Sequence, residues 1–200
     1  MVDAGLFLKT FVDVYKAKEK DCRNENQANW KEIWTNTYKW SMFMLDEENS
    51  VIKTVAKDMK LACARGEPLR LDAIFTTPQR YENWDWFPIL AAIEHENEPN
   101  GFHGEIKKLV SVQCGLKVGI TYALYDGNKK SAFTTTVKAK VERDFLEAIK
   151  VVDKRFKGID QEYLFIIGEE RADRLQTLVW NFWIYNPKNG EPDFHWMCLS

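Results

Sequence analysis

Residues 89–97 read ILAAIEHEN, five apolar residues followed by two glutamates that flank a histidine. Side chains of a strand alternate between its two faces, so Glu94 and Glu96 project to one side and His95 to the other. Two carboxylates side by side repel each other, and the cost rises where they are partly buried. A divalent cation removes that cost, because Mg²⁺ prefers hard oxygen ligands. The stretch therefore predicts a strand that ends in a metal-binding pair of carboxylates.

A third carboxylate lies in the apolar segment before this strand. Residues 69–75 read LRLDAIF and predict another strand, in which Asp72 stands between two apolar neighbours. An acid at such a position needs a partner, and pairing of the two strands would place Asp72 beside Glu94. An acid in one strand and two in the next suit metal-dependent phosphodiester cleavage, in which the metal polarises the phosphoryl oxygen and activates a bound water.

Hydrophobic periodicity predicts the other elements of the fold. Apolar residues three or four apart predict helices at 6–15, 30–45, 51–63, 104–113 and 137–156, with a polar loop at 18–29 and Gly66 as a helix terminator. Extended apolar runs predict further strands at 116–124, 162–170 and 177–185. This order of elements predicts a mixed α/β fold with a central sheet flanked by helices.

The length and charge of the chain favour one domain of an ordinary globular type. A chain of 200 residues can bury one substantial core, and it contains no low-complexity linker or internal repeat. We expect a single domain made of a helical segment at 1–66, a core at 67–126 and a last segment at 127–200. Lys and Arg number 28 against 30 Asp and Glu, which excludes a binder that relies on bulk positive charge but not an enzyme with a local basic groove.

Other patterns exclude several classes of protein. The four cysteines show no CxxC spacing, so neither a zinc ribbon nor a disulfide framework is expected. The sequence contains no phosphate-binding glycine loop and no GxSxG or HExxH motif. The first residues do not resemble a signal peptide, and no apolar run approaches the ~20 residues of a membrane span. We expect a cytoplasmic protein with reduced thiols and no membrane partner.

The segment from Asp72 to Tyr122 resembles the core of the PD-(D/E)xK, or restriction-endonuclease-like, nuclease superfamily. The resemblance consists of Asp72 in one strand, Glu94 and Glu96 at the end of the next, and then an amphipathic helix and an apolar strand. In that family an Asp and a Glu bind the metal, and a Lys two positions after the Glu orients or activates water. The resemblance implies Asp72 and Glu94 as metal ligands, a restriction-endonuclease-like core and Glu96 at the position of the lysine.

The glutamate at the lysine position is the main departure from the family pattern. Some restriction enzymes of the superfamily carry Glu there, and in others the lysine moves to the following helix. Lys107 and Lys108 lie in that helix, so either could stabilise developing phosphate charge. Glu105, in its first turn, is a possible additional carboxylate on the metal side. The resemblance thus keeps five candidate catalytic residues: Asp72, Glu94, Glu96, Lys107 and Lys108.

The loop between the two acidic strands carries candidate substrate contacts. Residues 79–86 read QRYENWDW, and four of them could stack on bases or contact the phosphate backbone: Arg80, Tyr81, Trp84 and Trp86. The alternative is a covering loop whose indoles fill a hydrophobic gap. His103 is expected to be a turn residue near the start of the following helix.

The leading hypothesis is a Mg²⁺- or Mn²⁺-dependent nuclease that hydrolyses DNA phosphodiester bonds. The alternative is a catalytically inactive member of the same fold that binds nucleic acid or protein, which the glutamate at the lysine position favours. In a third interpretation the acids are structural and pair with Arg70 or Lys117. DNA is the expected partner, and a homodimer is possible because dimers are common among restriction-type enzymes.

Overall fold

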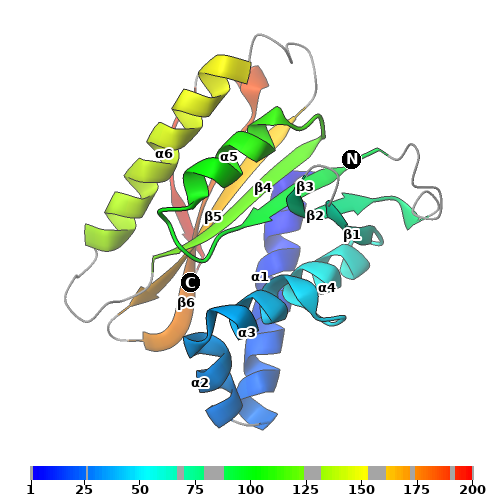
Figure 1. Ribbon diagram of the computed structural model, residues 1–200, viewed down its shortest axis with the longest axis vertical. Coiled ribbons are helices and arrows are strands. Elements are labelled where there is room, and N and C mark those ends of the chain that lie inside the picture. Colours follow the sequence, from blue (N-terminus) through cyan, green and yellow to red (C-terminus); the bar gives the residue numbers. More distant parts are fainter. Residues whose placement is uncertain are drawn as a thin grey trace.

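A mixed β-sheet forms the centre of the protein, and helices cover both of its faces (Figure 1). The computed structural model describes residues 2–25, 27–66, 70–78, 88–123, 132–152, 161–171, 174–189 and 192–199. Within these ranges seven strands follow one another across the sheet in chain order. The predicted α/β fold with a central mixed sheet flanked by helices is therefore confirmed.

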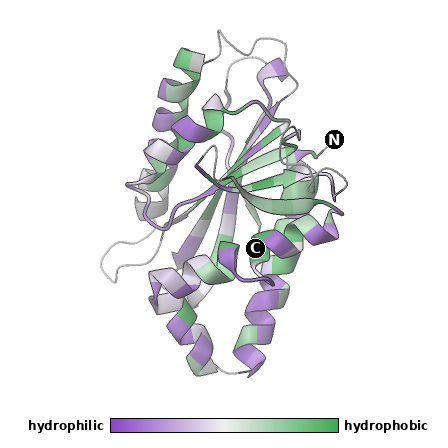
Figure 2. Ribbon diagram, turned by 45° about the vertical axis from the view of Figure 1, so that its right-hand side comes forward, coloured by the Kyte–Doolittle hydropathy of each residue, from purple (hydrophilic) through white to green (hydrophobic). Residues whose placement is uncertain are grey.

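The direction of the strands divides the sheet into three parts. The strands are β1 (Ala62–Gly66), β2 (Leu71–Thr76), β3 (Ala91–His95), β4 (Leu116–Ala123), β5 (Glu162–Arg171), β6 (Arg174–Tyr185) and β7 (Met197–Leu199). The first three pair antiparallel, β3 to β5 pair parallel, and β5 to β7 are antiparallel again. Hydrophobic residues concentrate in the central strands (Figure 2), as expected for a sheet buried on both faces.

The N-terminal helices cover one face of the sheet. They are α1 (Ala4–Glu25), α2 (Gln27–Thr35), α3 (Thr37–Ser41), a π-helical turn (Met42–Asp46) and α4 (Val51–Asp58). Their apolar residues pack with one face of β2 to β6 in a single core. Aromatic rings join the layers, since Tyr15 of α1 packs edge-to-face on Trp180 of β6 with ring centroids 4.8 Å apart. These rings hold the helices at a fixed position against the sheet.

Two helices cover the opposite face and supply the crossovers that parallel strands require. They are α5 (Phe102–Ser111), between β3 and β4, and α6 (Ala132–Val152), between β4 and β5. Phe145 of α6 lies at the centre of their core, with its ring 5.0 Å from that of Tyr163 and 5.2 Å from that of Trp183. In the described part of the chain, no helix is both long and apolar enough to cross a membrane.

Several predicted helix boundaries are wrong. The polar loop expected at 18–29 is helical, because α1 runs to Glu25 and α2 begins at Gln27. Lysine and glutamate, frequent in this stretch, are good helix formers, and their polarity suits a solvent-facing helix. The helix expected at 30–45 is interrupted at Asn36, whose side chain accepts a hydrogen bond from Lys39 N at 3.1 Å and so caps α3.

The strands at the two edges of the sheet were not predicted. The helix expected at 51–63 ends at Asp58, and Lys60 has a positive φ of 58° where the chain reverses into β1. Residues 62 and 63 therefore belong to a strand and not to the helix. Three residues of the expected tail form β7. The strand expected at 89–97 is shorter, because regular pairing covers only Ala91–His95.

The packing of α5 against the sheet can be tested by a substitution at Gly119 on β4. A Cβ atom there would lie 2.7 Å from Phe102 Cζ and 2.9 Å from Phe165 Cδ1. We expect Gly119→Ala to lower the free energy of unfolding by about 1–3 kcal/mol, the usual cost of overpacking. Gly104→Ala is the matched control, because a Cβ there meets no atom within 4 Å and alanine favours a helix. Urea denaturation measures the free energy of unfolding of both variants, and equal decreases would contradict this packing.

Candidate functional site

Asp72 and Glu94 lie next to each other on neighbouring strands. In the pairing of β2 with β3, Ala73 is opposite Ile93, so the next position of the register places Asp72 opposite Glu94 on the same face. Asp72 Oδ2 accepts a hydrogen bond from His95 N at 2.8 Å. This hydrogen bond from the β3 backbone to a β2 side chain joins the two strands just beyond their last backbone pair. The structure thus brings together the two acids expected to be metal ligands.

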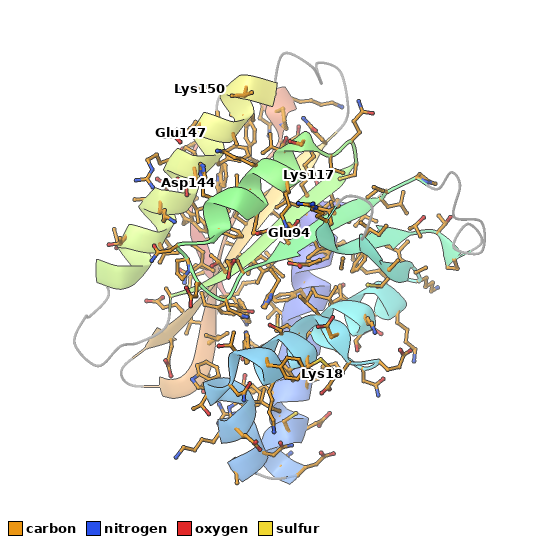
Figure 3. The ribbon with its side chains drawn as sticks, in the orientation of Figure 1. Lys18, Glu94, Lys117, Asp144, Glu147 and Lys150 are labelled. Carbon is orange, nitrogen blue, oxygen red and sulfur yellow. The ribbon has the colours of Figure 1, made fainter. Side chains whose placement is uncertain are left out.

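Glu94 is buried between β3 and α5 (Figure 3). Its neighbour on β4 is Gly119, against which the rings of Phe102 and Phe165 pack. The exposed fraction of Glu94 is 0 %, and the ammonium of Lys108 lies 2.9 Å from its Oε1 atom. A buried charge is costly unless it is paired, so the groups around this carboxyl group decide its protonation.

A single ammonium group stands among the carboxyl groups. Lys108 Nζ lies 2.9 Å from Glu94 Oε1, pairs with Glu105 of the same helix, and donates a hydrogen bond to the carbonyl oxygen of Arg70 at 2.9 Å. Glu105 and Lys108 are three residues apart and therefore share one face of α5. Lys107 lies on the exposed side of the helix. Of the two candidate lysines, the structure places Lys108 at the site.

The pKa values of these groups reflect their burial and mutual contact. Burial, together with contact with Glu105 and the charge of Asp72, raises the pKa of Glu94 to about 10, although Lys108 lowers it. Burial also raises the pKa of Asp72, more than the hydrogen bond from His95 N lowers it. Burial lowers the pKa of Lys108, but its contacts with Glu105 and Glu94 outweigh this effect and raise it. The cluster therefore retains a proton at neutral pH.

Glu96 does not lie with the other acids. It follows the last residue of β3, and its carboxylate accepts a hydrogen bond from Glu98 N at 2.9 Å and lies against Gly101. The alternation of a strand no longer orients a side chain after the strand has ended, which is why the predicted pairing of Glu94 and Glu96 is not seen among the described contacts. Glu105 supplies the third carboxylate near Glu94 instead.

Two further expectations concern Lys117 as an ion-pair partner of the acids and the loop residues as substrate contacts. Lys117, the alternative structural partner, is buried and donates hydrogen bonds to Gln161 Oε1 at 2.8 Å and to Tyr163 OH at 3.0 Å. The cation that contacts Glu94 is thus Lys108. The candidate substrate contacts Arg80, Tyr81, Trp84 and Trp86 lie outside the described residues.

A large groove reaches Asp72 from the helical side of the sheet. It has a volume of about 980 Å³, is lined mainly by α4, β1 and the residues between them, and includes four lysines: Lys18, Lys53, Lys57 and Lys60. Three acids also line it, Asp72 among them. A smaller cavity of about 410 Å³ shares Asp72 and continues to His95. Asp72 therefore lines both the lysine-lined groove and the smaller cavity, whereas the buried Glu94 lines neither of them.

A second group of possible metal ligands lies between α5 and α6. Ligand atoms of His103, Asp144 and Glu147 all lie within 4.8 Å of one another, and they are the one such set among the residues described. Asp144 already has cationic neighbours, with Arg143 at 3.1 Å and Lys140 at 3.9 Å. These contacts explain the buried charge of Asp144 without a metal. Sequence analysis did not identify this group, because its members come from two helices.

Comparisons with known proteins give no independent information about this site. No family model, curated protein or solved structure matches the chain. The resemblance to restriction-endonuclease-like nucleases therefore remains a prediction from the sequence. What the site does must follow from its own geometry and charges.

The raised pKa of Glu94 predicts how the stability of the protein depends on pH. A carboxyl group that holds its proton in the folded state above its ordinary pKa stabilises the fold at low pH, and this contribution is lost as pH rises toward the folded pKa of about 10. We expect the free energy of unfolding of the wild type to fall between about pH 5 and 9 relative to that of Glu94→Gln, which cannot ionise. Urea denaturation at several pH values measures the difference. Parallel pH profiles of the two proteins would show that Glu94 is not protonated in the fold.

Proposed function

We propose that this protein is a metal-dependent nuclease that hydrolyses DNA phosphodiester bonds. The observation that carries the proposal is the fully buried carboxyl group of Glu94, which lies beside Asp72 and in contact with the ammonium of Lys108. Buried carboxyl groups with strongly shifted pKa values cluster at functional sites. Here the cost of burying Glu94 is offset when a cation binds.

The donor set suits a hard divalent cation. Asp72 and Glu94 would hold Mg²⁺ or Mn²⁺, and the carboxylate of Glu105 lies near Glu94 without forming a third ligand position with Asp72. A metal held there would polarise a phosphoryl oxygen and lower the pKa of a bound water. Binding requires that Glu94 release its proton, so affinity for the metal rises with pH.

The surrounding residues position these groups. The hydrogen bond from His95 N fixes the carboxylate of Asp72, and Glu105 holds the side chain of Lys108 toward Glu94. The ammonium of Lys108 is only partly exposed, so its charge acts on a neighbouring phosphate with less screening by water than at the surface. We assign to Lys108 the stabilisation of negative charge that develops on the phosphate.

The order of the elements agrees with the family resemblance. Asp72 lies in β2, Glu94 near the end of β3, and an amphipathic helix and an apolar strand follow. Lys108 lies on that helix, as in members of the superfamily whose lysine has moved from the strand. The position of Lys108 therefore supports an active variant of the site in which Glu96 does not replace the lysine.

The groove supports a polyanionic substrate. Lysines attract a phosphate backbone and release its counterions, which provides most of the affinity that does not depend on sequence. Asp72 lines the same groove as these lysines, so a phosphate backbone bound there would pass this carboxylate. The chain as a whole has a formal charge of −2, so these lysines do not simply reflect a basic composition.

A second function has one specific observation in its favour. The ammonium of Lys108 already compensates the carboxylates without a metal, as in a structural ion pair. This arrangement would suit a catalytically inactive module of the same fold that binds nucleic acid or protein. Calorimetric titration with Mn²⁺ separates the two, because only the nuclease requires binding at Asp72 and Glu94.

Substitutions in the cluster test the catalytic assignment. We expect Asp72→Asn and Glu94→Gln each to abolish Mn²⁺-dependent cleavage of plasmid DNA and to weaken Mn²⁺ binding. Lys108→Ala should reduce the rate by about 100-fold, the effect of losing one group that stabilises charge in a transition state. Lys107→Ala is the matched control, because its side chain is exposed on the same helix. Cleavage that survives Glu94→Gln would exclude this site as the catalytic centre.

Reversal of single charges tests the groove. Lys57 and Lys60 are exposed in it, whereas Lys150 is exposed on α6. We expect Lys57→Glu and Lys60→Glu to weaken DNA binding, and the slope of log K against log salt to fall by about 0.9 for each phosphate that the variant no longer neutralises. Lys150→Glu makes the same charge change and should leave binding nearly unchanged. An equal effect of all three, measured by fluorescence anisotropy without metal, would indicate only bulk charge.

A further inference from the structure

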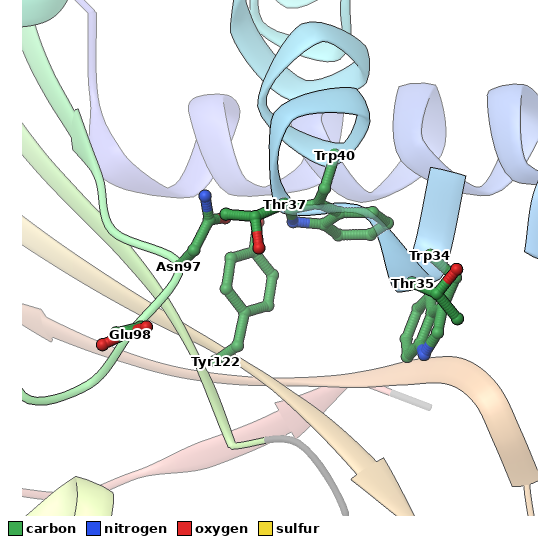
Figure 4. A pocket seen from close by; sticks show the side chains of 7 residues that line it. All are labelled: Trp34, Thr35, Thr37, Trp40, Asn97, Glu98 and Tyr122. Carbon is green, nitrogen blue, oxygen red and sulfur yellow. The ribbon is translucent and has the colours of Figure 1, made fainter. Parts of the chain in front are cut away.

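An aromatic pocket opens beside the end of the strand that carries Glu94. It has a volume of about 260 Å³ and lies between the helices α2 and α3 and the ends of β3 and β4 (Figure 4). Ligand pockets usually have volumes of roughly 300–1,000 Å³, so this one suits a single planar ring system. It is separate from the lysine-lined groove, and neither the metal nor the phosphate contacts proposed above use it.

Three aromatic rings form the walls of the pocket. The rings of Trp34 and Trp40 have centroids 5.3 Å apart, and those of Trp40 and Tyr122 have centroids 5.5 Å apart. Each pair is nearly perpendicular, at 76° and 79°, so a flat ligand can stack on one ring and meet the next at its edge. Tyr122 OH lies 2.7 Å from His95 Nε2, which fixes that wall in place. The pocket is therefore formed before a ligand binds.

A hydrogen-bond acceptor stands at the rim of the pocket. Glu98 is exposed and lines it, and Asn97, another lining residue, donates from Nδ2 to Ser41 Oγ at 2.9 Å. The carboxylate of Glu98, with no lysine or arginine among the described lining residues, favours a ligand that presents N–H donors and disfavours an anionic group.

His95 connects the pocket with the candidate centre. Its backbone N–H donates to Asp72, and its imidazole contacts Tyr122 on the other face of β3. Asn97 and Glu98 follow it in the chain by two and three positions. Asp72 and the Tyr122 wall of the pocket therefore both contact the same residue, His95.

We infer that this pocket holds one nucleobase of the substrate strand and prefers bases that present an amino group. The choice of a base as the ligand rests on the proposed nuclease function. Aromatic side chains stack with any base, so the preference comes from the rim. Guanine, cytosine and adenine each present an amino donor to Glu98, whereas thymine presents one N–H between two carbonyl oxygens that Glu98 repels. A base in this pocket is unpaired, so the substrate strand is single there.

Binding of oligonucleotides about twelve residues long, in EDTA, tests this inference without any cleavage. We expect the wild type to bind oligo(dA) and oligo(dC) more tightly than oligo(dT) in fluorescence anisotropy. Trp34→Leu should weaken the binding of oligo(dA) and oligo(dC) by about tenfold, the usual effect of removing one stacking partner. Trp196→Leu is the matched control, a half-buried indole on the α6 side of the sheet. Glu98→Gln should narrow the difference between oligo(dC) and oligo(dT), because an amide can donate to a thymine carbonyl.

The outcomes separate this inference from the proposed function. Equal affinity for the three oligonucleotides, or no difference between Trp34→Leu and Trp196→Leu, overturns the base pocket even if the protein cleaves DNA. Binding of tetramethylammonium, a cation that aromatic rings bind, at the pocket without any loss of oligonucleotide affinity also overturns it. A base preference that disappears in Trp34→Leu supports the pocket even if Mn²⁺ does not bind at Glu94. Circular dichroism melting of each variant checks that it is folded.

Discussion

The carboxyl group of Glu94 lies in the interior between β3 and α5, where the ammonium of Lys108 is 2.9 Å from its Oε1 atom. Removing such a group from water costs free energy, and the cost would be larger if it were charged. The ammonium of Lys108, 2.9 Å from Glu94 Oε1, reduces this cost, whereas the charge of Asp72 on the next strand increases it. This environment suits a carboxyl group that releases its proton when a cation binds.

The aromatic core explains why this group can be held in place. Rings from α1 and α3 pack against the sheet on one face, and Phe145 with Tyr163 and Trp183 packs on the other. Both faces of β3 are therefore covered, and its two sets of side chains serve different purposes. Glu94 belongs to the carboxylate cluster, while His95 joins Asp72 to the aromatic pocket. The carboxylate cluster, the lysine-lined groove and the aromatic pocket thus each include or adjoin residues near the end of β3 or its partner Asp72.

Sequence reasoning predicted the local features and missed the long-range ones. Alternation along β2 and β3 was enough to place Asp72 beside Glu94, because strand periodicity and antiparallel pairing fix which faces meet. It failed for Glu96, since the strand ends one residue earlier and a turn redirects that carboxylate. It could not choose between Lys107 and Lys108, because only the packing of α5 decides which side faces the sheet. The pocket of Trp34, Trp40 and Tyr122 depends on contacts between distant segments, which no local pattern reveals.

A crystal structure of the protein grown with Mn²⁺, with data collected at the manganese absorption edge, tests the proposed metal site most directly. We expect an anomalous peak within coordination distance of Asp72 and Glu94, with the ammonium of Lys108 displaced from Glu94. A peak confined to His103, Asp144 and Glu147, or no peak with Lys108 still paired to Glu94, would contradict the proposal.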